Sequence, residues 1–129
     1  MPEHTVPASE VVSRYLIDGE MRKDGVIRHQ AFMPSPRTMK HSVFRTSGLS
    51  EGEVWAIAME KVEPSRGRVI GRGDLLASLI YDRQLQLLPD QDTGSRHADI
   101  VGWSTERELR ATIAKELAAL ASPAKKRDS

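Results

Sequence analysis

The sequence predicts an α+β fold in which a mostly antiparallel sheet of about four or five strands packs against two helices. Three observations lead to this prediction. Short β-prone runs recur between turn residues, two segments have helical periodicity, and strands and helices do not alternate strictly along the chain. A doubly wound parallel sheet requires that alternation, so we do not expect one.

The length and composition bound the organisation of the chain. It has 129 residues, a formal net charge of +1 and no cysteine. Such a length fits one domain, and the lack of cysteine excludes disulfides and thiolate chemistry. We predict a flexible N-terminal arm at residues 1–9, a single globular domain at 10–122 and a disordered basic tail at 123–129. No signal peptide or membrane span is visible, which predicts a cytoplasmic protein.

The first third of the chain contains three candidate elements. Residues 10–17 have apolar side chains at helical spacing, and their β-branched content makes a strand the rival assignment. Residues 26–33 form a short candidate strand before a proline pair. Residues 39–46 alternate as a strand should, which puts His41 and Arg45 on the same face.

A helix is predicted to begin after Ser50. Ser50 is a favourable N-cap, and Glu53 stands three residues later as its capping-box partner. Leu49 and Val54 have the spacing of a hydrophobic staple. The apolar stripe that follows predicts docking on the sheet through Trp55, and the helix is expected to end at Pro64.

The second half predicts strands followed by the strongest helix. Residues 75–81 are nearly all apolar and indicate a buried strand, although periodicity alone does not exclude a helix, and residues 84–88 continue the pattern. Residues 95–103 indicate a central strand. A long amphipathic helix then follows Thr105, which with Glu108 has capping-box spacing.

The candidate site residues lie on two of these strands. His97 and Asp99 share a strand face, so the carboxylate can orient the imidazole for acid/base catalysis, and Arg96 beside them can hold an anion. His41 and Arg45 share a face of the strand at 39–46. If the two strands are neighbours, these histidines and arginines converge on a pocket for phosphate or a nucleotide. The alternative is that all of them serve the fold.

No metal or cofactor is predicted from the sequence. His97 and Asp99 supply only two ligands, and a metal site needs more from elsewhere in the chain. The segment 90–94 begins like a calcium loop, but glycine stands at position 94 and valine at 101, where that loop requires oxygen ligands. We therefore interpret the segment as a turn.

Three sequence segments together resemble those of a known family. The chain carries Phe44-Arg45, Gly48-Leu49-Ser50-Glu51 and His97-Ala98 followed by Ile100 and Gly102-Trp103. This layout resembles a family of small bacterial proteins to which no activity is attached, over roughly residues 10–121. Where that family often has proline after the last tryptophan, this chain has Ser104. The resemblance implies no catalytic residues, and it marks Arg45 and His97 for testing.

The sequence favours a small binding or interaction module that acts with a partner protein, because no catalytic constellation is complete. The alternative is a binder of nucleotides or phosphorylated ligands, or a small enzyme, that uses Arg45, Arg96, His97 and Asp99. A second alternative is weak nucleic-acid binding through the basic segment 22–45. The three differ in what they need: an apolar patch, a polar pocket or a continuous basic surface.

Overall fold

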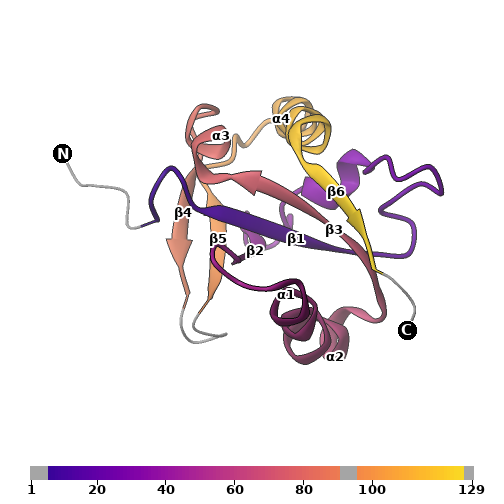
Figure 1. Ribbon diagram of the computed structural model, residues 1–129. Coiled ribbons are helices and arrows are strands. Elements are labelled where there is room, and N and C mark those ends of the chain that lie inside the picture. The colour runs from indigo at the N-terminus through magenta and orange to yellow at the C-terminus, as the bar shows by residue number, and fades with distance from the viewer. Residues whose placement is uncertain (1–5, 91–95, 127–129) are drawn as a thin grey trace.

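The computed structural model describes residues 6–90 and 96–126, which form an α+β fold around one antiparallel sheet. The six-stranded open sheet has the order β4-β5-β2-β1-β3-β6 (Figure 1). The predicted fold class is confirmed, and the sheet is slightly larger than the predicted four or five strands. Its strands are β1 (Val11–Ile17), β2 (His41–Arg45), β3 (Val69–Leu76), β4 (Gln86–Pro89), β5 (His97–Val101) and β6 (Ser122–Lys125).

Helical segments cover both faces of this sheet. A continuous helical segment at residues 51–66 lies on one side in Figure 1, and α3 and α4 lie on the other. The two predicted helices are both present, and α3 is an addition. The segments are a 3-10 turn (His29–Phe32), α1 (Glu51–Ile57), a π-helical stretch (Ala58–Val62), α2 (Glu63–Arg66), α3 (Ala77–Tyr81) and α4 (Arg107–Leu120).

The sheet separates two hydrophobic cores of unequal size. The main core lies on the side of α3 and α4, and includes Leu16, Phe32 and Leu117. The second core lies under the helical segment at residues 51–66, and includes Tyr15 and Phe44. A side chain of the sheet therefore belongs to one core or the other according to the face it occupies, and this decides which candidate residues can meet.

Residues 11–17 form the strand β1, and the helix that their spacing favoured is not present. The strand pairs with β2 on one side and with β3 on the other. Val12 and Leu16 enter the main core, while Tyr15 enters the second core. A strand that is buried on both faces does not show simple polar and apolar alternation, which is why its pattern was ambiguous.

Ordered structure extends beyond both predicted domain boundaries. Val6 is fully buried in the main core, and its carbonyl accepts a hydrogen bond of 2.6 Å from the Tyr81 hydroxyl. Residues 122–125, mostly in the predicted tail, pair with β3 as the edge strand β6. The rest of the predicted arm and tail, residues 1–5 and 127–129, lies outside the described residues.

The capping box predicted at the start of α1 is confirmed. The Ser50 hydroxyl accepts a hydrogen bond from the Glu53 amide, and the Glu53 carboxylate accepts one from the Ser50 amide. The helix does not end at Pro64, because that residue occupies the first turn of α2, where a missing N–H breaks no hydrogen bond. Val54 is buried on the sheet, and Trp55 is only partly buried.

Three other local predictions are corrected. Residues 26–33 form no regular strand, because a single bridge joins Met21 to Ile27 and a 3-10 turn follows. The apolar run 75–81 is divided between the end of β3 and α3, since an evenly apolar run carries no periodicity to separate the two. Glu106, not Thr105, occupies the N-cap of α4, and its side chain makes no capping hydrogen bond.

Candidate functional site

The two strands that carry the candidate residues are neighbours, but they do not bring all of those residues together. In the antiparallel pair of β2 and β5, Phe44 lies opposite His97 and Ser42 lies opposite Asp99. Directly opposed residues share a face of a sheet. His97 and Asp99 therefore lie on the same face as Phe44, and the alternation of β2 turns His41 to the opposite face. The expected convergence of both histidines is wrong.

His41 is part of the main core. Its ring contacts Phe32 and Trp103, with centroids 5.7 and 6.4 Å away. Its Nδ1 lies 3.2 Å from the carbonyl oxygen of Met33. Burial holds the pKa of His41 well below its ordinary value, and the nearby Arg14 charge lowers the pKa further. We conclude that His41 is a neutral core residue on the opposite face of the sheet from His97.

The two predicted phosphate-binding arginines have other partners. Arg45 forms an ion pair with Glu10 at 3.3 Å, on the face away from His97. Arg96 donates from Nη1 to the Arg45 carbonyl at 3.3 Å. Neither residue lines the cavity beside His97. The structure thus keeps His97 and Asp99 of the predicted set near each other and places Arg45 in a separate ion pair.

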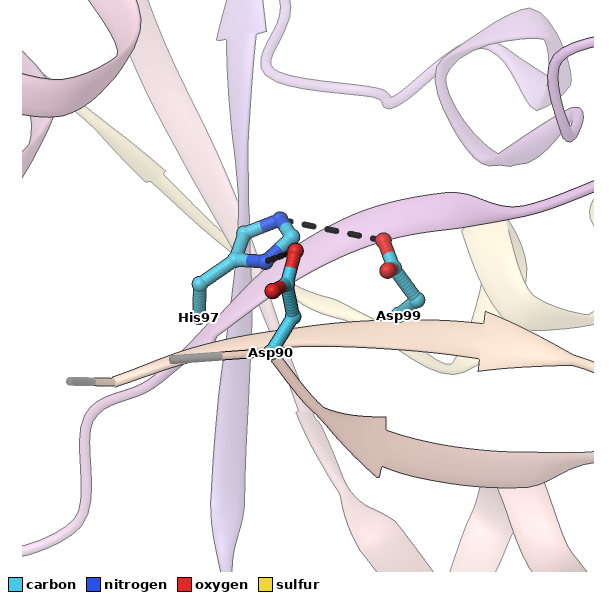
Figure 2. Close-up of side chains that lie close together, drawn as sticks. All are labelled: Asp90, His97 and Asp99. Atoms are coloured by element: carbon cyan, nitrogen blue, oxygen red, sulfur yellow. Dashed lines mark ion pairs between the residues drawn. The ribbon is translucent and has the colours of Figure 1, made fainter. Parts of the chain in front are cut away.

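His97 lies between two carboxylates at the border of the second core (Figure 2). Its Nδ1 is 3.3 Å from Asp90 Oδ2, and its Nε2 is 3.7 Å from Asp99 Oδ1. The distance to Asp99 is too long for a hydrogen bond. The distance to Asp90 would allow one, but the angles do not, so Nδ1 is buried without a hydrogen-bond partner. Asp99 therefore does not orient the imidazole as predicted.

A cavity lies beside His97, between the sheet and the helical segment at residues 51–66. Its volume is about 120 Å³. Its ionisable lining is basic apart from one tyrosine, and no carboxylate contributes to the wall. The lining residues are Arg14, Tyr15, Ser42, Phe44, Lys61, Val62, Ser65, Arg66 and His97.

Arg14 is the unusual residue of this cavity wall. Its Nη1 donates to the Ser42 carbonyl at 3.0 Å, and its Nε is buried without a hydrogen-bond partner. Among the described residues, no carboxylate lies within ion-pair distance of its guanidinium. Burial lowers the pKa of Arg14 to about 10, and the nearby Arg66 charge contributes to this shift. Arg14 is a partly buried cation with a buried Nε, the nearby Glu20 charge favours it only in part, and an anionic ligand would stabilise it further.

Arg66 lies in the same cavity wall, and its guanidinium has both an ion-pair partner and a hydrogen-bond partner. Its Nη2 donates to both carboxylate oxygens of Glu20 at 2.9 Å, and its Nη1 donates to the Tyr15 carbonyl at 2.9 Å. Lys61 is exposed near the cavity. Arg14 and Lys61 are therefore the two basic residues of the cavity lining whose positive charge is available to a ligand.

Sequence reasoning missed all three of these basic residues. Arg14 and Arg66 are 52 residues apart in sequence and meet only because β1 passes beneath the helical segment at residues 51–66. The one local signal was the position of Arg14 itself, a charged residue inside the apolar run at 11–17. Treating the run as a helix concealed the significance of this charge, because a helix would have placed Arg14 on a solvent-exposed face.

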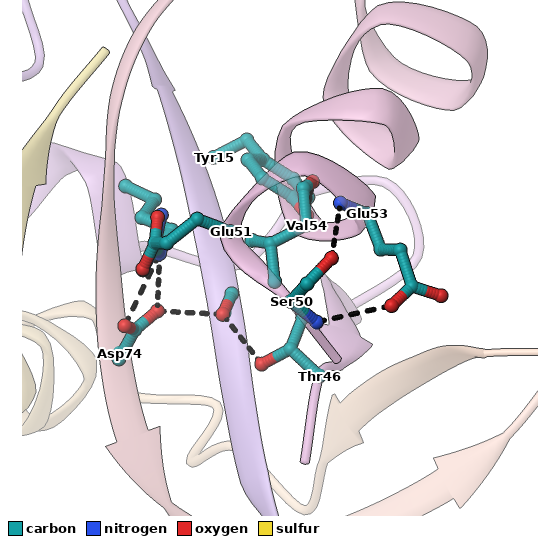
Figure 3. A network of polar contacts seen from close by, with 9 residues as sticks. Tyr15, Thr46, Ser50, Glu51, Glu53, Val54 and Asp74 are labelled. Carbon is teal, nitrogen blue, oxygen red and sulfur yellow. Dashed lines mark hydrogen bonds and ion pairs between the residues drawn. The ribbon is translucent and has the colours of Figure 1, made fainter. Parts of the chain in front are cut away.

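A second polar cluster on the same face is held together by ion pairs and belongs to the fold. Arg72 is 6% exposed, and it donates to Glu51 at 2.7 and 2.9 Å and to both carboxylate oxygens of Asp74 at 3.1 Å. Figure 3 shows Glu51 and Asp74 in this network, which continues through Ser13 to Thr46. The network fastens α1 to the sheet, and both of its carboxylates contact Arg72.

The basic segment predicted for nucleic-acid binding is only partly available. Arg22 forms an ion pair with Asp24 at 3.0 Å, Arg45 pairs with Glu10, and His41 is buried. The exposed large apolar side chains are spread over a loop, the helical segment at residues 51–66, β3, β4 and α4. They are Val26, Met59, Leu76, Leu88, Leu109 and Leu120.

Comparisons with known proteins add no family assignment. No protein-family model, no curated protein and no solved structure matches the chain. Within residues 6–90 and 96–126, none of the helices is long and apolar enough to cross a membrane.

Proposed function

We propose that this protein binds a small anion, namely a phosphate group or the phosphate end of a larger molecule, in the cavity beside His97. The observation that carries the proposal is the partly buried Arg14 side chain, which lines a cavity with a basic wall; among the described residues its buried Nε has no hydrogen-bond partner and its guanidinium has no carboxylate partner. An anion there would relieve the unfavourable burial of the charge and would accept a charge-assisted hydrogen bond from Nε.

The size of the cavity limits what the ligand can be. Pockets for drug-sized ligands are roughly 300–1,000 Å³, whereas this one is about 120 Å³. It is nevertheless several times larger than the space one water molecule requires. A phosphate group therefore fits the volume better than a whole nucleotide, whose base and sugar would have to lie outside.

Each basic residue has a distinct role in this proposal. Arg14 supplies the buried donor, and the exposed Lys61 supplies a mobile positive charge near the cavity. Arg66 keeps the wall in place through Glu20 and donates nothing to the ligand. His97 closes another side of the cavity and contacts Phe44 edge to face, with centroids 5.2 Å apart.

The other two functions stay as weaker proposals. Binding to a partner protein calls for a contiguous apolar patch, and the exposed apolar side chains lie on separate elements. Nucleic-acid binding calls for one basic surface, and parts of the basic segment are paired or buried. A cytoplasmic location also remains a prediction.

Isothermal titration with inorganic phosphate at low salt tests the proposal on wild type, Arg14→Met and Arg37→Met. Arg37 is exposed on a turn far from the cavity lining, so its variant controls for the loss of one positive charge. Removing a charge-assisted hydrogen bond of about 1.5–3 kcal/mol should weaken binding roughly 10- to 100-fold in Arg14→Met. Equal affinities for the two variants, or no binding by wild type, would contradict the proposal.

A further inference from the structure

Three potential metal ligands meet where β4 and β5 pair. Asp90 directly follows β4, and its amide donates to the His97 carbonyl at 2.9 Å, so the two residues lie opposite each other. Asp99 is two residues beyond His97 on β5, and it therefore points to the same face. Figure 2 shows the three side chains together, and one ligand atom from each lies within 4.8 Å of the others.

Asp99 contributes a nearly buried carboxylate to this cluster. Asp99 is only 9% exposed, and among the described residues no lysine or arginine lies within ion-pair distance of its carboxylate. Its Oδ1 accepts a hydrogen bond of 3.4 Å from the Ser42 hydroxyl. A protonated His97 would offset at most one of the two carboxylates, whereas a divalent cation would offset both.

His97 provides an independent indication of a ligand. The residue is 5% exposed, and its Nδ1 is buried without a hydrogen-bond partner. Buried imidazole nitrogens are normally satisfied, and one without a partner requires an explanation such as a missing ion. A neutral imidazole with a free lone pair is also the form in which histidine binds metals.

We propose that Asp90, His97 and Asp99 form a binding site for a divalent transition metal ion, with Zn²⁺ as the best match to one imidazole and two carboxylates. Bond lengths of about 2.0–2.1 Å around a tetrahedral ion place neighbouring ligand atoms roughly 3.3 Å apart. The separation of 3.3 Å between His97 Nδ1 and Asp90 Oδ2 matches this spacing, and Asp99 Oδ1 lies 3.7 Å from the other ring nitrogen.

One ion can use only one ring nitrogen, so a small rearrangement must accompany binding. The two carboxylates now lie near different nitrogens of His97. The Asp90 side chain is 31% exposed, which leaves it room to turn toward the ion, whereas Asp99 is held in β5. Three protein ligands leave at least one coordination position for water or another oxygen ligand.

Isothermal titration of the tag-free protein with Zn²⁺ tests the site. The variants are Asp90→Asn and Asp99→Asn, which keep the side-chain shape and remove a charged ligand, and Asp82→Asn serves as a control on an exposed acid after α3. Each ligand variant should bind Zn²⁺ at least tenfold more weakly than wild type, with Asp82→Asn unchanged. Circular dichroism on each variant verifies that it is folded.

The visible spectrum of bound Co²⁺ gives a second readout, which would not change if Asp90, His97 and Asp99 served only the fold. The chain has no cysteine, so a visible Co²⁺ spectrum with the intensity of four- or five-coordination arises from nitrogen and oxygen ligands alone. That spectrum should disappear in Asp99→Asn and persist in Asp82→Asn. Equal Zn²⁺ affinity in wild type and Asp99→Asn, or a Co²⁺ spectrum identical to that of the aqueous ion, would overturn the proposal.

Discussion

Replacing Arg14 by methionine should make the ligand-free protein more stable, although it removes a hydrogen bond to the Ser42 carbonyl. Burial and the Arg66 charge lower the pKa of Arg14 from its ordinary value to about 10. At about 1.4 kcal/mol per pKa unit, the charge destabilises the native state by about 3 kcal/mol at neutral pH. Losing the charged hydrogen bond to Ser42 costs about 2 kcal/mol, which leaves a net gain of about 1 kcal/mol.

The sign of this effect is the same across the ordinary pH range. A base whose native pKa lies below its unfolded pKa destabilises the native state at every pH below the native value. The gain in Arg14→Met should therefore be constant between about pH 6 and 9, well below about 10. Methionine retains most of the aliphatic packing of the arginine stem, so the change isolates the charge.

Urea unfolding in phosphate-free buffer measures this effect, with the fluorescence of Trp55 and Trp103 as the signal. With a slope of about 2 kcal/mol per molar urea, the midpoint of Arg14→Met should rise by about 0.5 M. Arg66→Met is the matched comparison, and it should lower stability by about 3 kcal/mol because it leaves the Glu20 carboxylate unpaired. If Arg14→Met is destabilised by more than about 1 kcal/mol, Arg14 is a structural residue and our interpretation of the cavity fails.

Three further changes test other parts of the structure. The native pKa of His41 lies below its ordinary value, so the unfolded chain takes up the proton first as pH falls. The free energy of unfolding of wild type should therefore decrease as pH falls below about 6.5. In urea titrations, His41→Phe should reduce the slope of this free energy against pH by up to about 1.4 kcal/mol per pH unit. Gly71→Ala should destabilise the protein by about 1–3 kcal/mol in the same assay, because a Cβ there would lie 2.8 Å from the Ala124 backbone oxygen. A smaller loss of stability in Gly71→Ala than in Gly52→Ala would contradict this prediction. Ser50→Ala should lower the melting temperature by a few degrees through loss of about 1 kcal/mol of capping, and an unchanged melting temperature would count against the capping box.

The elements that sequence reasoning placed correctly are those whose signal is local. The Ser50–Glu53 capping box is a four-residue pattern, and it is present in the structure as written in the sequence. The strand at 39–46 alternates because β2 separates a core face from a more polar one. By contrast, β1 is buried on both faces, so its apolar side chains face two cores and do not alternate with polar ones. The resulting spacing of apolar residues was mistaken for that of a helix.

The candidate site was only half predictable for a geometric reason. Sequence reasoning considered the pairing of β2 with β5 only as a condition, and the structure has that pairing. Pairing alone leaves the register undetermined, and a shift of one residue moves every side chain to the opposite face. The observed register places Phe44 opposite His97, which sends His41 and Arg45 to the other side of the sheet. Local spacing contains no information about this choice, because it depends on how the whole sheet is packed.

His97 stands between the two proposed sites, and for that reason a His97 variant separates them poorly. Its ring lines the cavity with Arg14, and its two nitrogens face the carboxylates of Asp90 and Asp99. Replacing the histidine would remove a metal ligand, open the cavity and leave Phe44 without its ring contact in a single step. The charge variants do not share this ambiguity, since Arg14→Met removes a cation of the cavity and Asp99→Asn removes an anion of the metal cluster. Loss of phosphate binding in the first and of Zn²⁺ binding in the second would therefore assign the two ligands to two different sites that share His97.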